Sequence, residues 1–312
     1  MLRNFVFASF LFLLPLVSGD PQCDCYLTDG SSPTYFTSHG FWDFRSLSQY
    51  ASSPAVIDSV DGNANSPTTS AFFDWGTPLR DFWAPQQYKN GDTSFPMVKT
   101  FNNLYIQADG GSDTYLRMRS TRLPGFQTAA ELQSNQMLDH ASIRMHSRIT
   151  GSTGACGSVF TYLHSENPAD VQESDIEMLT KDGHNLVHYT NQPGVLNGEP
   201  VPGATHEINL PGGKQWSDWT THRLDWTPGK TLFYADGQQV LVSDFQVPRD
   251  KSYVLLNMWS DGGSWTGSMP QGGEATMDVQ WVEILHGVTN KESCRNVCSV
   301  DASGEVGTAV LV

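Results

Sequence analysis

The chain has 312 residues, of which 18 are basic and 33 are acidic, and its formal net charge at pH 7 is −15. This negative charge disfavours nucleic acid and anionic membrane surfaces as partners, whereas a neutral polymer is unaffected by it. All-β folds often form a single unit of about 200 to 250 residues. We therefore expect one domain with short tails.

The first 19 residues have the pattern of a signal peptide. A basic residue, Arg3, precedes an apolar run, and small residues close the segment before Asp20. The run has about 13 residues, fewer than the roughly 20 that are needed to cross a bilayer. We expect residues 1–19 to be removed and the mature protein to be secreted, without a membrane anchor.

Five cysteines fit an oxidising compartment. Cys23 and Cys25 lie near the mature start, and Cys294 and Cys298 lie near the end, in a tail at residues 291–312. These four favour two disulfides over a metal site and would tie the termini together, although four cysteines allow three connectivities. Cys156 is left over and is expected to be a buried, inert thiol.

Residues 20 to about 104 are rich in Ser, Pro, Gly and aromatic residues, and they predict an edge strand with loops that wall a groove. Trp75, Trp83 and Phe101 are candidate contacts for a ligand in this part. Packing in the core is the alternative for each of them.

From Thr114 onward, short segments rich in Val, Ile, Thr and aromatic residues alternate with turn residues, and helical periodicity is scarce. Asp236-Gly237 is a strong hairpin signal. The pattern predicts an all-β domain over residues 20–290, a sandwich of two antiparallel sheets with one sheet curved to form a groove. The predicted strands are 114–120, 142–149, 158–163, 173–179, 185–190, 220–226, 231–235, 239–242, 252–259 and 276–285.

Glu173, Asp175 and Glu177 stand two residues apart in one predicted strand, so their carboxyl groups share one face. Such crowding raises the pKa of each acid and is typical of sites that need both a proton donor and a carboxylate. With side chains leaning inward, the outer carboxyls lie about 5 Å apart. That separation is expected of a retaining glycosidase. A solvated acidic strand, arising by chance, is the alternative.

His188, Tyr189, Asn191 and Gln192 follow the acidic strand closely enough to lie on its neighbour, and they are candidate ligand contacts. Amide groups can donate to and accept from sugar hydroxyls, and rings can stack on a sugar face. Strand alternation lets either His188 and Thr190, or Tyr189 and Asn191, face the groove. A role of residues 191–193 in stabilising a turn is an equal alternative.

Trp259 and Trp265 flank a glycine-rich loop after the strand at residues 252–259. Exposed indole rings commonly mark ligand sites, and we predict that both contact the substrate, with core packing of one of them as the alternative. His222 and Asp225 do not suggest a serine-type triad, because no Gly-x-Ser-x-Gly elbow accompanies them. We expect no metal and no organic cofactor.

Four segments together resemble the fungal branch of glycoside hydrolase family 16. They are residues 173–177, 188–193, 222–226 with 234–237, and 257–263, and the resemblance extends over roughly residues 115–285. It implies a concanavalin A-like jelly roll and retaining hydrolysis of internal β-1,3 or mixed β-1,3/1,4 bonds in glucan. It also admits transglycosylases that act on cell-wall glucan and chitin.

Carried over residue by residue, the resemblance implies that Glu173 is the nucleophile, Asp175 its hydrogen-bonding helper and Glu177 the general acid and base. The family usually has an aliphatic residue where this chain has Ser174. A hydroxyl facing the sandwich interior there needs a partner, such as a backbone carbonyl. We expect a monomer, outside the cell or associated with the cell wall, whose partner is a polysaccharide. A non-catalytic, lectin-like glucan-binding protein is the remaining alternative, and the intact Glu173 and Glu177 argue against it.

Overall fold

The computed structural model describes residues 22–60, 66–90, 95–109 and 113–312. The predicted signal peptide at residues 1–19 lies outside these ranges. Strands dominate the described residues, and the α-helical part there is the short α1 (Pro78–Phe82). No helix in the described ranges is long and apolar enough to cross a membrane.

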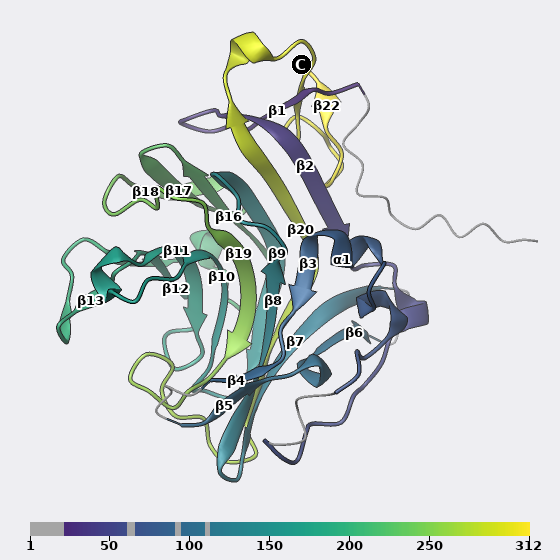
Figure 1. Ribbon diagram of the computed structural model, residues 1–312, viewed down its shortest axis with the longest axis vertical. Helices are drawn as coiled ribbons and strands as arrows, with labels where there is room; N and C mark the ends of the chain where they lie inside the picture. The colour runs from purple at the N-terminus through teal and green to yellow at the C-terminus, as the bar shows by residue number, and fades with distance from the viewer. Residues whose placement is uncertain (1–21, 61–65, 91–94, 110–112) are drawn as a thin grey trace, which may run out of the picture.

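One curved sheet, which we call the front sheet, is antiparallel throughout (Figure 1). From one edge to the other it consists of β3 (Trp83–Pro85), β8 (Phe126–Ser134), β19 (Tyr253–Trp259), β10 (Cys156–Leu163), β11 (Gln172–Leu179), β12 (Leu186–Asn191) and β15 (Thr205–Asn209). The strand that carries the three acids, β11, is therefore an inner strand with a partner on each side.

The second sheet, the back sheet, packs behind it. Its strands are β18 (Gln238–Ser243), β17 (Lys230–Ala235), β16 (Thr220–Thr227), β9 (Ala141–Gly151) and the long β20 (Glu274–Thr289). The first half of β20 then pairs with β7 (Thr114–Leu123), which continues to β6 (Leu104–Ala108), and its second half pairs with β2 (Tyr35–Asp43).

The two sheets are joined by the β7–β8 hairpin, in which Thr121 pairs with Thr128. Gly125 in its turn has a φ of 87°, a conformation that favours glycine. The short β5 (Met97–Lys99) pairs in parallel with β8, and β4 (Tyr88–Asn90) pairs with β5. β13 (Val195–Leu196) pairs with β14 (Glu199–Pro200) in a small hairpin. The β7–β8 hairpin carries the chain from the back layer of the sandwich into the front layer.

The core lies between the facing surfaces of the two sheets. Ile176 and Met178 of β11 point into it, and Trp226 of β16 is fully buried there. Trp83 is also part of this core, so the core alternative holds for this tryptophan. Trp75 is instead exposed, and Phe101 is half-buried.

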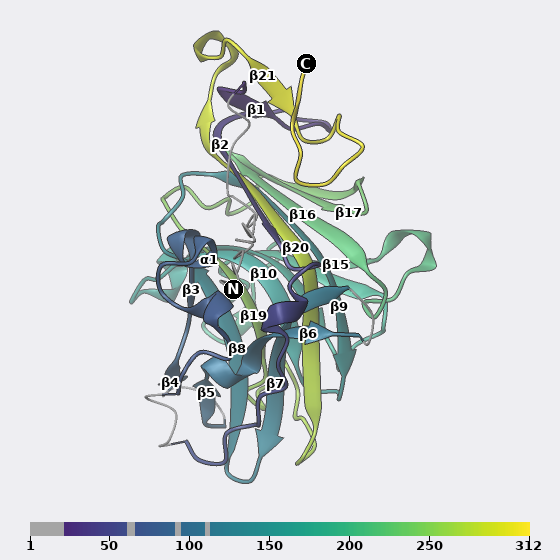
Figure 2. The ribbon, with the colours of Figure 1, turned by 90° about the vertical axis from the view of Figure 1, so that its right-hand side faces the viewer.

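Two disulfides tie the termini together, Cys23–Cys298 and Cys25–Cys294. They accompany a parallel pairing of β1 (Cys25–Leu27) with β21 (Val297–Ser299), and β22 (Val310–Leu311) adds to this group. Figure 2 shows these strands beyond the end of the sandwich. Both disulfides thus join the start of the chain to its end, as expected. Cys156 is a buried free thiol.

The predicted strands after Thr114 are all present, with small differences at their ends. The strands in that part that were missed are β8, β13, β14, β15, β21 and β22. Residues 20–104 also hold more strands than the one edge strand expected, because β1 to β5 all lie there. Of these, β3 is one of the two edge strands of the front sheet.

Candidate active site

The three acids lie on the outer face of the front sheet, which is the face turned away from the back sheet. Ser174, Ile176 and Met178 alternate with them along β11 and point into the core. Strands β10 and β12 pair with β11 on both sides and fix this alternation. Glu173, Asp175 and Glu177 therefore share one face, as the spacing predicted.

Burial is the main reason that the pKa of each of the three acids is raised. Asp175 and Glu177 are buried. The charges of Glu173 and Glu177 raise the pKa of Asp175 further, in addition to burial. A hydrogen bond between Asp175 and Glu173 raises the pKa of Asp175 further, and it lowers that of Glu173. The pair therefore holds a proton on Asp175 that is donated to Glu173.

The surroundings of Asp175 fit this protonation. Gln192 donates from Nε2 to Asp175 Oδ2 at 3.0 Å, whereas the buried Oδ1 atom accepts no hydrogen bond from any described residue. A proton on Asp175, shared with Glu173, satisfies the otherwise unpaired oxygen. Gln192 also donates its backbone N–H to the backbone carbonyl of Glu173 at 2.9 Å, so it positions both acids.

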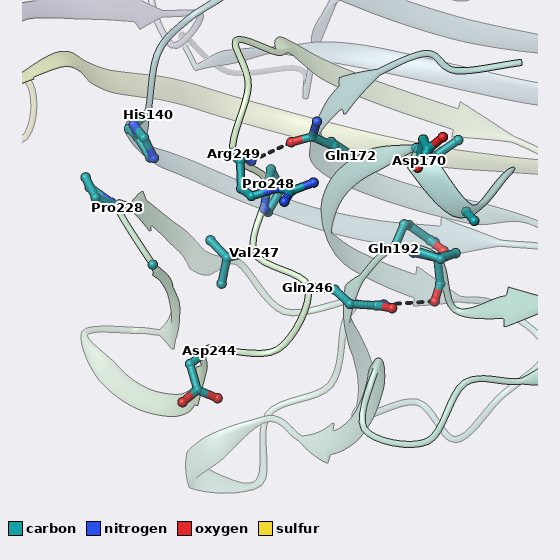
Figure 3. A pocket seen from close by; sticks show the side chains of 14 residues that line it. His140, Asp170, Gln172, Gln192, Pro228, Asp244, Gln246, Val247, Pro248 and Arg249 are labelled. Carbon is teal, nitrogen blue, oxygen red and sulfur yellow. Dashed lines mark hydrogen bonds between the residues drawn. The ribbon is translucent and has the colours of Figure 1, made fainter. Parts of the chain in front are cut away.

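Gln192 separates these acids from a hollow of about 600 Å³ at the start of β11. Figure 3 shows Gln172, Gln192, Gln246 and Arg249 around this hollow. None of the three acids lines it. The hollow is therefore not where the carboxyl groups would meet a ligand.

Glu177 accepts two hydrogen bonds on the same oxygen, Oε1. Trp265 donates to it from Nε1 at 3.2 Å, and Cys156 donates from Sγ at 3.3 Å. Both contacts lower the pKa of Glu177 against the larger upward effect of burial. Burial also raises the pKa of the Cys156 thiol, so this cysteine acts as a neutral donor.

His188 lies beside Glu177 on the neighbouring strand and shares its outward direction. Its Nε2 atom is 2.7 Å from Asp182 Oδ2, and its ring meets the Trp265 ring edge-on with centroids 5.0 Å apart. His188 thus holds the indole in place next to Glu177.

The loop after β19 places Trp265 through its own hydrogen bonds. Asp261 Oδ1 accepts from the Gly263 N–H and from the Thr266 hydroxyl, both at 2.8 Å. Lys181 donates from Nζ to the carbonyl of Ser264 at 2.6 Å and links the loop to the end of β11. Trp259 pairs with Cys156 in register and lies half-buried on the same outer face.

Tyr189 and Asn191 lie on the opposite face of β12 and do not reach the acids. Tyr189 is in the core against Phe233, with ring centroids 5.1 Å apart, and Asn191 is 2% exposed. The prediction that these two residues contact a ligand is therefore wrong. The register of β12 against β11 turns His188 and Thr190 outward instead.

Asn191 is the hydrogen-bond partner that the buried Ser174 hydroxyl needs. The Ser174 hydroxyl, which is fully buried, donates to Asn191 Oδ1 at 2.7 Å. The expected direction of Ser174 is thus confirmed, but its partner is a side-chain amide and not a backbone carbonyl.

Several polar residues of the outer face were not among the site residues predicted from the sequence. Strand pairing aligns Glu131, Asn257 and Ser158 in one row that continues to Glu177. The Ser158 hydroxyl donates to Asn257, and Lys99 Nζ lies 2.6 Å from Glu131 Oε2. The signal available for Ser158 was the alternation within its predicted strand, whereas Glu131 lies on β8, one of the strands that were missed.

Residues 91–283 match the family model described as glycosyl hydrolases family 16. This match spans more than half of the chain. The chain belongs to this family. It is 27% identical over 244 residues to the beta-glucanase of Bacillus licheniformis, an alignment that covers 77% of this chain and 91% of that protein. A beta-glucanase of Paenibacillus polymyxa is 26% identical to this chain, in an alignment that covers 65% of this chain and 86% of that protein.

Solved structures show the same fold. The Bacillus licheniformis beta-glucanase superposes with a TM-score of 0.53 and 23% identity, over 67% of this chain and 92% of that chain. A prokaryotic β-1,3-1,4-glucanase (lichenase) from a mouse hindgut metagenome gives a TM-score of 0.55 with 17% identity, over 80% and 99%. The predicted jelly-roll sandwich is thus confirmed. These relatives are bacterial or prokaryotic, so they support the family and not its fungal branch.

Proposed function

We propose that this family 16 protein is a secreted, retaining endo-β-glucanase that hydrolyses β-1,3 or mixed β-1,3/1,4 bonds. One observation carries the proposal: Glu173 and Glu177 share the outer face of β11, with Asp175 between them and hydrogen-bonded to Glu173. The names beta-glucanase and lichenase of similar proteins support the glucan substrate. The leader pattern at residues 1–19 and the two disulfides support secretion.

The reaction proceeds in two displacements. Glu177 donates its proton to the glycosidic oxygen while the Glu173 carboxylate attacks the anomeric carbon, so the bond between carbon and leaving oxygen breaks and a glycosyl ester forms. Glu177, now a carboxylate, takes a proton from water, and the hydroxide attacks the same carbon. The ester bond breaks, Glu173 leaves as a carboxylate, and the anomeric configuration is retained.

The neighbours of the two glutamates support this division of roles. The proton of Asp175 stabilises the Glu173 carboxylate. The Cys156 thiol and the Trp265 indole are neutral donors to Glu177, at 3.3 and 3.2 Å, and neutral donors stabilise an anion less than charged ones do. Burial still raises the pKa of both glutamates, that of Glu173 to about 8, so the division of roles rests on the hydrogen bond between Asp175 and Glu173 and on the family resemblance.

The position of the acids also gives the direction of a bound chain. In a retaining enzyme the two carboxyl groups flank the scissile bond from opposite sides. Both lie along β11, so a glucan held between them crosses this strand. A long chain consequently runs across the strands of the front sheet, toward β15 on one side and toward β3 on the other.

Glu173→Gln and Glu177→Gln test the proposal on laminarin and lichenan, with release of reducing ends as the readout. Each variant should lose activity by orders of magnitude, at least about 1,000-fold, with an unchanged unfolding midpoint at acidic pH. Glu292→Gln is a matched control, because Glu292 is exposed in the tail that follows β20 of the back sheet. It should retain full activity.

Azide separates the two roles with an activated aryl glucoside. It should restore turnover of one variant by forming an inverted glycosyl azide, and that variant is expected to be Glu173→Gln. Restored turnover with an inverted azide in Glu177→Gln instead would reverse the assignment. Binding of both glucans by the wild type, with no reducing ends released between pH 4 and 7, would contradict enzymatic function. Products longer than the starting oligosaccharide would identify a transglycosylase.

A further inference from the structure

A second hollow, of about 640 Å³, lies at the β3 edge of the front sheet. It is formed where α1 and β3 follow each other along the chain (Figure 1). Residues that line it include Asp74, Trp75, Arg80, Ala84, Gln87 and Phe101. Two of these, Trp75 and Phe101, are aromatic residues whose role the sequence left open between ligand contact and core.

Ala84 connects this hollow at the sheet edge to the face that carries the three acids. Register connects Asp175 to Phe160, Phe160 to Leu255, Leu255 to Gln133, and Gln133 to Ala84 of β3. Directly paired residues of antiparallel strands point to the same side, so Ala84 shares the outer face with Asp175. Four strand spacings separate them, about 19 Å along the sheet. A glucan that crosses β11 toward β3 reaches the hollow after several sugar units.

Trp75 offers a ring surface at this edge. Its side chain is 79% exposed, more than any other large hydrophobic residue among those described. The Arg80 guanidinium lies 3.8 Å from the centroid of the indole ring, while Arg80 itself is only 7% exposed. This cation–π contact fixes the ring to the buried arginine and leaves most of its surface to solvent. A rigid, exposed indole binds the apolar face of a sugar at low entropic cost.

The hollow also contains polar groups without partners. Arg80 Nε and Gln87 Oε1 are buried, and neither makes a hydrogen bond with any residue that the structure describes. A buried donor or acceptor that stays unpaired costs about 1–3 kcal/mol. Both residues line the hollow, and sugar hydroxyls, which can both donate and accept, offer partners to such groups.

We propose that Trp75, Arg80 and Gln87 form a distal subsite that binds a sugar unit of a long β-glucan chain, remote from the bond that is cleaved. The inference rests on the proposed function for the direction of the chain. Its consequence is a preference for polymers over short oligosaccharides. The ligand is a neutral sugar, because the hollow is lined by residues of opposite charge, Asp74 and Arg80, and by aromatic rings.

The test compares Trp75→Ala with Trp75→Phe and with the exposed control Val242→Ala on β18 of the back sheet. The value of kcat/KM is measured on lichenan and on an activated disaccharide glycoside too short to reach β3. We expect Trp75→Ala to lose about 5- to 10-fold on the polymer and less than about 2-fold on the disaccharide, with Trp75→Phe in between. The control should match the wild type on both.

Equal losses on the two substrates, or no loss on the polymer, would overturn the subsite. Should the wild type cleave no glucan, the proposed function fails, and affinity electrophoresis in gels containing laminarin or lichenan still decides the subsite. Retardation that is lost in Trp75→Ala and kept in Val242→Ala supports it, whereas equal migration of all the variants refutes it. The thermal unfolding midpoint of each variant shows that the comparison concerns folded protein.

Discussion

Asn191→Ala should destabilise the protein while it spares the chemistry. The amide of Asn191 sits between the sheets, where Oδ1 accepts from Ser174 and Nδ2 donates to Thr231 of β17 at 2.9 Å and to the carbonyl of Phe245 at 2.8 Å. It thereby connects the front sheet to the back sheet. Removing the amide leaves the Ser174 hydroxyl without its partner at a position with no solvent exposure.

The size of the effect follows from the groups that lose partners. At least two of them, the Ser174 hydroxyl and the Phe245 carbonyl, lose a hydrogen bond, and each such loss costs about 1–3 kcal/mol. We expect a loss of about 3–4 kcal/mol in the free energy of unfolding. In a protein of this size, 1 kcal/mol corresponds to roughly 2–4 °C, so the midpoint of thermal unfolding should fall by about 6–16 °C.

Urea unfolding at pH 5 measures the loss, and a double-mutant cycle with Ser174→Ala locates it. In the Ser174→Ala background no hydroxyl is left unpaired, so Asn191→Ala should cost about 1–2 kcal/mol less. For the folded variant, kcat/KM on lichenan should stay within about 3-fold of the wild type, because Asn191 faces away from the acids. An unchanged unfolding midpoint together with a large loss of activity would refute this reasoning and would indicate that Asn191 contacts the ligand.

Three further predictions concern the acids and the termini. Asp175→Ala removes the donor that lowers the pKa of the proposed nucleophile, so the acid limb of kcat/KM against pH should move to higher pH, and Asp175→Asn, which keeps a donor, should move it less. Trp265→Phe removes a contact that lowers the pKa of Glu177, so the basic limb should also move to higher pH. Replacing Cys23 and Cys298 with serine should cost only about 2 kcal/mol in urea unfolding, because the remaining disulfide still closes almost the same loop, and full reduction should cost about 5 kcal/mol.

Local sequence predicted the strands with clear alternation and failed where pairing overrides propensity. The segment of β8 includes Thr128, Ala129, Ala130 and Glu131, and alanine and glutamate are not strand-forming residues. It is nevertheless a strand because β19 and β3 pair with it on its two sides and the β7 hairpin leads into it. These partners are distant in the sequence, so nothing within β8 itself indicates them.

The sequence predicted which acids form the candidate site, but not which face of the neighbouring strands lies beside them. The two-residue spacing of the acids is local, and β11 shows it as expected. Which face of β12 accompanies them depends on the pairing of Glu177 with His188, and a shift by one residue would turn Tyr189 and Asn191 outward. The same holds for Cys156, which reaches Glu177 only through the register of β10 against β11.

The Glu-x-Asp-x-Glu pattern reads alike in both directions, and the spacing gives no reason to prefer either glutamate as the nucleophile. The surroundings are not symmetric. Asp175 bonds to Glu173 and, being protonated, stabilises its anion, whereas the donors to Glu177 are a thiol and an indole. The Asp175 bond favours ionisation of Glu173 against burial, which still raises its pKa to about 8, and burial also outweighs the weaker donors at Glu177. Because the donors to Glu177 come from two other segments, β10 and the loop after β19, the assignment of roles depends on the tertiary fold and not on the motif alone.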